Sequence, residues 1–373
     1  MIDITKIARP CILNRKDYVP GKPVEEVQRE FGIKDIIKLA SNENPLGASP
    51  LAVKAMVREL QTNANFYPES LAPSLTAKLA KKFNLTSDHF YIDNGADGIL
   101  SKLGMAFINP GDDCIISALT FPVYESIIGL MTGNCVVIPQ TADYRSNVDG
   151  MIKAITPKTK LVFLCNPNNP TGTITTRDEF DRLIKAIPEN TLLISDEAYY
   201  EFADDPDYPQ SLEYLEKYPN LIVLRTFSKV YGLAGVRVGY AIAHPDLIRA
   251  LLKTRETFAV NRAAQAGALA AMDDEEFIVK ARQANAAGRK QIYDGLFSMG
   301  FKAYPAQGNF VFSDLGHPVA PIFNGLLREG VIIRPLGPQG APNCIRVSVG
   351  TAEQNERFLK ALQKVFTEVY PAA

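Results

Sequence analysis

The sequence predicts an α/β fold with a mainly parallel sheet, followed by a smaller α+β domain. In the middle of the chain, short apolar runs alternate with amphipathic stretches, which is the pattern of strands joined by helices. The runs recur roughly every 20 to 30 residues, and this spacing leaves room for a crossover helix in several gaps. After Ala263 the pattern changes to one long helical stretch and shorter strands. We therefore expect two domains of different architecture.

The strands of the larger domain are marked by short apolar runs. We expect them at residues 114–117, 135–139, 161–165, 192–195, 221–224 and 238–243. One connecting helix has a clear start, because Thr176 and Glu179 have the spacing of a capping box. Phe180, Leu183 and Ile184 follow at helical spacing. This alternation of strand and helix favours parallel strands.

The smaller domain is expected to begin with a helix over residues 275–299. Strands are expected at residues 310–313, 331–334 and 345–349, before a last helix that contains Phe358 and Leu362. The Pro- and Gly-rich opening of the chain is expected to form an arm outside the sheet. The expected boundaries are residues 1–45 for the arm and part of the small domain, 46–265 for the large domain, and 266–373 for the small C-terminal α+β domain.

Composition excludes several classes of function. The 373 residues carry a formal net charge of −1, so no global field would attract nucleic acid or an acidic membrane. The five cysteines are scattered and the three histidines lie far apart, so we expect neither disulfides nor a metal site. No apolar run approaches the roughly 18 residues of a membrane span, and the first 13 residues lack the h-region of a secretory signal. We expect a cytoplasmic protein without membrane or nucleic-acid partners.

Unusual polar segments follow three of the expected strands. They are Asn166-Pro-Asn-Asn-Pro-Thr-Gly172, Asp196-Glu-Ala-Tyr199 and Arg225-Thr-Phe-Ser-Lys229. Because ligands of open α/β sheets bind at the carboxyl ends of the strands, these segments are expected to meet at one site. A fourth segment, Asp93-Asn-Gly-Ala-Asp97, precedes a helical pattern. Free N–H groups at the start of that helix would offer a seat for a phosphate.

In these residues the sequence resembles the fold type I aminotransferases that use pyridoxal 5′-phosphate (PLP), and within them the histidinol-phosphate aminotransferase family. The shared motifs, in chain order, are Ser41-Asn-Glu-Asn-Pro-Leu-Gly47, Phe66-Tyr-Pro-Glu69, Asn94-Gly-Ala-Asp97, Asn169-Pro-Thr-Gly172, Asp196-Glu-Ala-Tyr199, Thr226-Phe-Ser-Lys229 with Arg237, and Ile345-Arg-Val-Ser-Val-Gly350. Each motif alone is a weak signal, but together they extend over essentially the whole chain. The resemblance implies an aspartate-aminotransferase-like, three-layer αβα fold with a seven-stranded sheet.

The resemblance also implies catalytic roles for Lys229, Asp196 and Tyr199. Lys229 would carry PLP as a Schiff base, since an amine condenses with an aldehyde and, once freed by substrate, can move a proton. Asp196 would pair with the pyridine nitrogen, with an attraction on the order of 5 kcal/mol at about 3 Å and a dielectric near 20. Asn169 and Tyr199 would lie beside the phenolic oxygen, where hydrogen bonds tune the pKa of the imine.

The remaining cofactor contacts are implied by the same resemblance. The phosphate would be bound by the loop and side chains of Gly95, Ala96, Asp97, Thr226, Ser228 and Arg237. Phe121 would stack on the pyridine ring, although a role in core packing is an alternative. Tyr67 matches a tyrosine that in relatives reaches the cofactor of the partner subunit, which implies a homodimer. A structural Tyr-Pro turn is the alternative for Tyr67.

The substrate contacts are expected from arginine and asparagine side chains. Arg346 lies on a predicted strand, where burying its charge without an anion would be costly, and relatives use it to bind a carboxylate or phosphate of the substrate. Arg334 is expected to add a second positive contact, with Asn42 and Asn94 lining the same pocket. The implied reaction is a ping-pong transamination between a small-molecule amino donor and a 2-oxo acid acceptor, 2-oxoglutarate.

The implied donor is histidinol phosphate, which would place the enzyme in histidine biosynthesis. An aromatic amino-acid aminotransferase stays open, since a phenyl ring and an imidazole fill similar apolar space. An amino acid phosphate decarboxylase and a PLP-binding regulator are further alternatives, but Lys229 and Asp196 are both present, which favours an enzyme. The sequence leaves the preferred donor and the extent of domain closure open. In one departure from many relatives, Gly98 replaces a glutamate, and glycine weakens a helical turn by up to about 1 kcal/mol.

Overall fold

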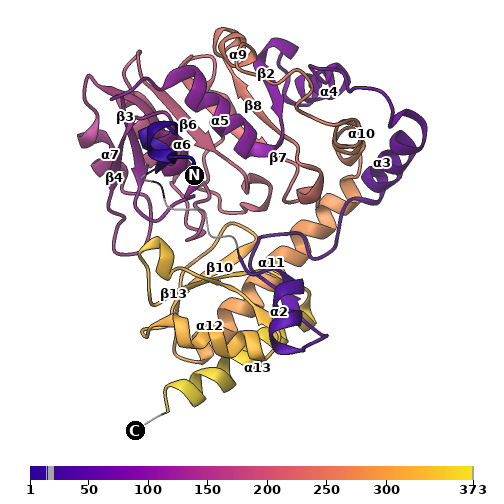
Figure 1. Cartoon of the computed structure of the whole chain (residues 1–373), viewed down its shortest axis with the longest axis vertical. Coiled ribbons are helices and arrows are strands. Elements are labelled where there is room, and N and C mark those ends of the chain that lie inside the picture. Colours follow the sequence, from indigo (N-terminus) through magenta and orange to yellow (C-terminus); the bar gives the residue numbers. More distant parts are fainter. Residues whose placement is uncertain (14, 16–20, 372–373) are drawn as a thin grey trace.

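The computed structural model of the chain describes residues 1–13, 15 and 21–371. Figure 1 shows a larger part built on a wide sheet and a smaller part below it, with the long helix α11 (Glu275–Ser298) extending from one to the other. Within the described residues, no helix combines the length and the apolar character needed to cross a bilayer.

The larger part contains a seven-stranded sheet in the order β2-β8-β7-β6-β5-β3-β4. Pairing is parallel from β7 to β4, whereas β8 runs antiparallel to both of its neighbours. The strands are β2 (Phe90–Asp93), β3 (Asp113–Ser117), β4 (Asn134–Ile138), β5 (Thr159–Cys165), β6 (Leu192–Asp196), β7 (Leu221–Thr226) and β8 (Gly239–Ala243). Consequently β5, β6 and β7 end at the same edge of the sheet.

Helices cover both faces of this sheet, because successive strand residues point to opposite sides. Val162 and Leu164 of β5 pack in one apolar cluster, and Leu161 and Phe163 pack in the other. The first cluster includes α3 (Pro50–Asn63), α4 (Pro73–Phe83), α7 (Val148–Ala154), α8 (Arg177–Ala186) and α10 (Arg262–Ala271). The second includes α5 (Gly95–Phe107), α6 (Val123–Leu130) and α9 (Pro245–Leu252). The predicted three-layer α/β fold is confirmed.

The smaller part contains an antiparallel sheet in the order β12-β13-β10-β9 and a short parallel pair, β1 with β11. Its strands are β1 (Ile37–Lys38), β9 (Lys302–Ala303), β10 (Phe310–Asp314), β11 (Val331–Ile332), β12 (Arg334–Pro335) and β13 (Cys344–Ser348). Its remaining helices are α2 (Val24–Phe31), α12 (Val319–Arg328) and α13 (Ala352–Val369), and a short α1 (Pro10–Leu13) lies near the chain start. The core joins Ile292 of α11, Leu326 of α12 and Phe358 of α13.

The predicted strands of the larger sheet agree with the observed ones to within a few residues, and the capping box at Thr176 and Glu179 is present in full. The edge strand β2 was not predicted. The expectation of one strand over residues 331–334 was wrong, since β11 and β12 lie in different sheets on either side of Ile333. All of these residues are apolar and buried except Arg334, so the apolar run concealed the break. The domain boundaries stay a prediction, and residues 14 and 16–20 of the expected arm lie outside the described residues.

Candidate active site

A cavity of about 480 Å³ lies where the strand ends of the large sheet face the smaller part of the molecule. It brings together segments that are far apart in the sequence, including thirteen of the sixteen predicted site residues. Those thirteen are Asn42, Ala96, Asp97, Phe121, Asn169, Asp196, Tyr199, Thr226, Ser228, Lys229, Arg237, Arg334 and Arg346. Gly21, Ala40, Ser41, Glu43 and Gln339 also line the cavity.

Lys229 follows β7 by three residues and extends into this cavity. Its Nζ lies 3.5 Å from the carbonyl oxygen of Asn42 and 5.4 Å from the ring centre of Tyr199. Burial, and then the positive charge of Arg346, lower the pKa of Lys229 to about 8, since a low dielectric disfavours the charged amine. Near neutral pH the residue therefore supplies an appreciable fraction of neutral, nucleophilic amine.

Asp196 is the last residue of β6 and is buried in the same cavity. Its Oδ2 accepts a 2.6 Å hydrogen bond from the hydroxyl of Tyr124, and its Oδ1 accepts one from the backbone N–H of Ala198. Burial raises the pKa of this carboxyl to about 6, and the two donors act against that rise. Sequence reasoning missed Tyr124, although it lies three residues after Phe121 in a segment that had already been singled out.

The start of α5 lies beside Arg237 and the hydroxyls of Thr226 and Ser228. Together these groups form a site suited to binding an anion. Arg237 donates to Ser228 Oγ at 3.4 Å and pairs with the carboxylate of Asp97 at 3.5 Å. Thr226 Oγ1 donates to the Ser228 hydroxyl at 3.0 Å. The backbone N–H groups of the first helical turn add donors and the positive end of the helix dipole.

Steric contacts explain why two positions in the first turn of α5 are glycines. Gly95 has a φ of +75°, and a Cβ atom there would lie 2.5 Å from Nη2 of Arg237. The missing side chain therefore lets the guanidinium lie across the loop. At Gly98, a Cβ atom would lie 3.2 Å from the carboxylate of Asp93, which is hydrogen-bonded to the backbone N–H of Asn94. Close packing against Asp93 explains why a small residue suits this position.

Asn169 and Tyr199 approach the cavity from two different strand ends. Asn169 Oδ1 accepts a 2.6 Å hydrogen bond from Arg346, which leaves its Nδ2 group to donate. Asn42 donates from Nδ2 to the Tyr199 hydroxyl oxygen at 3.0 Å, so the hydroxyl proton of Tyr199 can point to a ligand. Asn42 itself has a positive φ of 55° and is fixed by Ser348, which the sequence reading did not single out.

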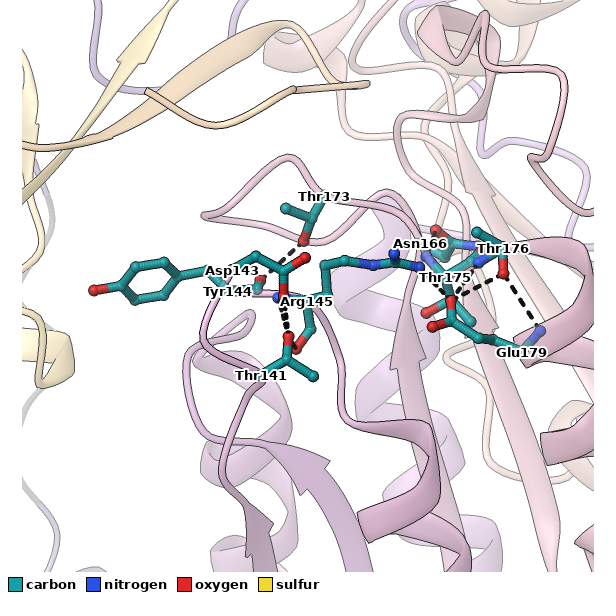
Figure 2. A network of polar contacts seen from close by, with 9 residues as sticks. All are labelled: Thr141, Asp143, Tyr144, Arg145, Asn166, Thr173, Thr175, Thr176 and Glu179. Atoms are coloured by element: carbon teal, nitrogen blue, oxygen red, sulfur yellow. Dashed lines mark hydrogen bonds and ion pairs between the residues drawn. The ribbon is translucent and has the colours of Figure 1, made fainter. Parts of the chain in front are cut away.

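Residues on both sides of Asn169 in the sequence, Asn166 before it and Thr173 to Thr176 after it, belong to a polar network (Figure 2). The side chain of Asn166 exchanges two 3.0 Å hydrogen bonds with the backbone of Thr175. The hydroxyl of Thr173 donates to the carbonyl oxygen of Tyr144 at 2.9 Å, and the Tyr144 ring extends from the network toward the smaller part of the molecule. These contacts position Asn169 without using its own side chain.

Arg346 and Arg334 form a pair of neighbouring cations. They are directly opposite each other on the antiparallel strands β13 and β12, and both line the cavity. Like charges at such positions repel, and Arg346 is buried. A bound anion would neutralise this repulsion, so the pair favours a ligand with a carboxylate or a phosphate.

Three predicted residues do not line the cavity of this chain. Gly95 lies directly behind Arg237, Asn94 is exposed, and Tyr67 is 78% exposed and stacks on Phe258. Their proposed contacts stay predictions. In the described ranges, no group of three or more His, Cys, Asp or Glu gathers where it could hold a metal ion, and all five cysteines are free.

The chain is similar to known proteins over nearly its whole length. The family described as aminotransferase class I and II matches residues 34–362. The histidinol-phosphate aminotransferase of Moorella thermoacetica is 45% identical over 358 residues, which are 96% of this chain and 92% of that protein. Histidinol-phosphate aminotransferase 2 of Methylococcus capsulatus is 42% identical over 369 residues, covering 98% of this chain and 99% of the relative.

Solved structures share the fold. The histidinol-phosphate aminotransferase from Sinorhizobium meliloti, in complex with pyridoxal-5′-phosphate, is 28% identical with a TM-score of 0.89, and the match covers 97% of this chain and 98% of that chain. The aspartate aminotransferase from Thermus thermophilus with maleate has a TM-score of 0.81 at 24% identity, with 94% and 97% of the two chains covered. The second likeness shows the common fold alone.

Proposed function

This chain belongs to the class I and II aminotransferases, and from that premise we propose that it transfers the amino group of histidinol phosphate to 2-oxoglutarate. It is a PLP-dependent enzyme. The main support for this substrate is a pair of facing arginines, Arg346 and Arg334, in the cavity that also contains Lys229. The reaction belongs to histidine biosynthesis.

The residues of the cavity fit PLP. Lys229 offers an amine of lowered pKa, and Asp196 offers a buried carboxylate. The loop at Gly95 has the space that a Cβ atom would fill, and Arg237 reaches into it beside the free N–H groups of α5. A phosphate monoester bound here would accept hydrogen bonds from a helix N-terminus, a guanidinium and hydroxyl groups at a single site. We assign the phosphate of PLP to this site and its aldehyde to Lys229.

When bound, PLP supplies an aldehyde that condenses with amines and a ring that accepts the electrons released at the carbon bearing the amino group. Lys229 Nζ would hold the cofactor through its aldehyde until the substrate amine displaces it. The freed amine would then take the proton from the carbon that bears the amino group and deliver it to the carbon of the former aldehyde. Its pKa of about 8 suits this work, since a base is most effective when its pKa is near the working pH. Asp196 keeps the ring nitrogen protonated through its negative charge.

Asn169 and Tyr199 would donate hydrogen bonds to the phenolic oxygen of the cofactor. Asn169 has its Nδ2 group available because Oδ1 accepts from Arg346, and Tyr199 has its hydroxyl proton available because Asn42 donates to the oxygen. Phe121 lines the cavity with its ring held edge-on against Tyr124. We propose that it covers one face of the ring, and that Asn42 and Asn94 contact the substrate.

The two arginines account for both substrates of the proposed reaction. Histidinol phosphate carries a dianionic phosphate, whereas 2-oxoglutarate carries two carboxylates. Arg346 and Arg334 present planar donors that suit either group. Phenylalanine and tyrosine carry one carboxylate and an uncharged ring, so they would neutralise this pair less completely. The geometry thus supports histidinol phosphate over an aromatic donor.

We further propose that the enzyme is a homodimer in which Tyr67 reaches the cofactor of the partner subunit. Aminotransferases of this family act on amino and keto acids and are typically dimeric. Besides Tyr67, α3 and the segment after it carry further exposed apolar side chains: Val57, Leu60, Phe66 and Leu71. An apolar patch of this kind is characteristic of a protein interface.

The substrate assignment is tested by a half-reaction. Protein loaded with PLP is mixed separately with histidinol phosphate, phenylalanine and tyrosine, and the loss of the PLP absorption band is followed in time. We expect histidinol phosphate to convert the cofactor fastest at equal concentration. The absence of conversion with histidinol phosphate would exclude it, and faster conversion with phenylalanine would assign the enzyme to aromatic amino acids.

A further inference from the structure

Tyr124 lies behind the cavity rather than in it. It belongs to α6, is fully buried at 0% exposure, and is absent from the cavity lining. Its hydroxyl nevertheless donates a 2.6 Å hydrogen bond to Oδ2 of Asp196. Such a short bond to a carboxylate is charge-assisted and is among the stronger hydrogen bonds found in proteins.

The ring of Tyr124 is fixed from two sides. It stacks on Phe163 of β5 with centres 4.9 Å apart and planes at 15°. It also meets Phe121 edge-on, with centres 5.7 Å apart and planes at 82°. Because both neighbours restrict the ring, the hydroxyl is held in one position relative to the sheet. The same tyrosine therefore contacts both Asp196 and the aromatic residue that lines the cavity.

The surroundings of Asp196 otherwise favour its neutral form. Burial raises its pKa to about 6, and the nearby carboxylates of Asp97 on α5 and of Glu197, directly after β6, also raise it. The thiol of Cys165 on β5 is also nearby, but burial raises its pKa to about 12, so it stays neutral. Hydrogen-bond donors act against these effects and stabilise the carboxylate, and Tyr124 is the largest of them.

We propose that Tyr124 is a positioning residue of the transamination site, which keeps the carboxylate of Asp196 ionised and in one orientation while it supports the ring of Phe121. The inference rests on the proposed function, since it takes Asp196 as the partner of the cofactor's ring nitrogen. Tyr124 acts through Asp196 and not by touching the cofactor. Loss of its hydroxyl would leave the buried Oδ2 without this donor and favour the protonated acid.

The test compares two ligands of the apo-protein: PLP, and its 1-deaza analogue, in which a C–H group replaces the ring nitrogen. Wild type is expected to bind PLP more tightly than the analogue, because only PLP offers a charged partner to Asp196. The preference is measured as the Kd of the analogue divided by the Kd of PLP. In Tyr124→Phe this ratio should fall about tenfold. The fall should be larger at pH 6 than at pH 8.5, where the carboxyl ionises in either protein. Equilibrium titration measures binding and does not depend on turnover.

Tyr91→Phe is the matched control. Tyr91 is 2% exposed and donates a 2.7 Å hydrogen bond to Oδ2 of Asp93, so the substitution removes the same kind of contact. Asp93 does not line the cavity. Both variants should lose thermal stability, but Tyr91→Phe should leave the ratio of the two Kd values unchanged. A change in the ratio with both variants would assign the effect to general loosening and overturn the positioning role.

A double variant tests whether Tyr124 acts through Asp196. In Asp196→Asn, position 196 no longer carries a carboxylate for Tyr124 to stabilise, so adding Tyr124→Phe should alter the ratio no further. A further tenfold fall would show that Tyr124 acts independently of Asp196. If wild type itself does not prefer PLP over the analogue, the assignment of Asp196 in the proposed function fails. If wild type prefers PLP and Tyr124→Phe retains the full preference, only the inference on Tyr124 fails.

Discussion

Arg346 Nη1 donates a 2.6 Å hydrogen bond to Oδ1 of Asn169, although 177 residues separate them in the sequence. The other terminal nitrogen of Arg346 donates to the carbonyl oxygen of Ala40 at 2.5 Å. The guanidinium is thus held by the asparagine turn of the large sheet and by the segment near the chain start, while its own strand lies in the small sheet. A substrate anion would meet a cation whose orientation is already set, which lowers the entropic cost of binding.

We predict that Arg346→Lys raises the KM for histidinol phosphate by at least about tenfold, because lysine cannot reproduce the planar, two-pronged contact. Arg334→Lys should have a smaller effect, since Arg334 is only partly buried and a point charge at this edge retains part of the attraction. Steady-state kinetics with each variant provide the measurement. An unchanged KM in Arg346→Lys would remove this residue from the substrate site.

Lys229 should give a pH dependence that differs from that of an ordinary lysine. Its lowered pKa of about 8, against a usual 10.5, means that the neutral amine becomes populated at lower pH. The rate at which apo-protein attaches PLP covalently should therefore rise through about pH 8 and then level off. Borohydride reduction followed by peptide mapping measures the attachment. A midpoint near pH 10.5, or labelling that persists in Lys229→Ala, would contradict the assignment.

Strand ends and motif residues were accessible to sequence reasoning because local patterns determine them. The apolar runs identified β3 to β8, and the polar residues that follow β5, β6 and β7 do line one cavity. Tyr124 was not recognised, because its partner Asp196 is 72 residues away. In the sequence, a tyrosine among apolar residues indicates only a role in core packing. The pairing of Arg334 with Arg346 was equally hidden, since the register of two strands is a property of the folded sheet.

The loop at Gly95 gives a prediction with a close control. In Gly95→Ala, the added Cβ atom would lie 2.5 Å from Nη2 of Arg237, so the guanidinium must move and PLP should bind about tenfold to 100-fold less tightly. Gly111 also has a positive φ, of 85°, but a Cβ atom there meets nothing within 4 Å. Gly111→Ala should therefore cost about 1 kcal/mol of stability and leave the Kd for PLP unchanged. Equal losses of affinity in both variants would argue against a phosphate seat at Gly95.

The contribution of Tyr67 across the dimer is tested by mixing two inactive proteins. A Tyr67→Ala subunit keeps Lys229, and a Lys229→Ala subunit keeps Tyr67. If Tyr67 acts on the partner's cofactor, each mixed dimer contains one complete site, and random mixing should restore roughly a quarter of the wild-type activity. Light scattering checks that the dimers form. Dimers that mix without regaining activity would place Tyr67 in its own subunit's site, and a Tyr67→Ala protein that is fully active before mixing would place it in no site.

The last prediction concerns the ion pair between Glu197 and Arg225 behind the site. Glu197 Oε2 accepts from Nε of Arg225 at 2.9 Å and from Nη2 at 2.8 Å, and the two side chains are 1% and 4% exposed. Glu197 directly follows Asp196, so the pair joins the end of β6 to β7. Arg225→Met leaves a buried carboxylate without its cation and should lower the free energy of unfolding by about 3–5 kcal/mol, as measured in urea.

The double variant Glu197→Leu with Arg225→Met should recover most of that loss, because it buries no charge. Arg182 and Asp149 form the control pair, since their side chains are 51% and 64% exposed. Arg182→Met should change the free energy of unfolding by less than about 1 kcal/mol, because water screens an exposed pair. If Arg225→Met costs no more than Arg182→Met, the buried pair does not hold β6 and β7 together, and the position of Asp196 must depend on the backbone ladder and Tyr124 instead.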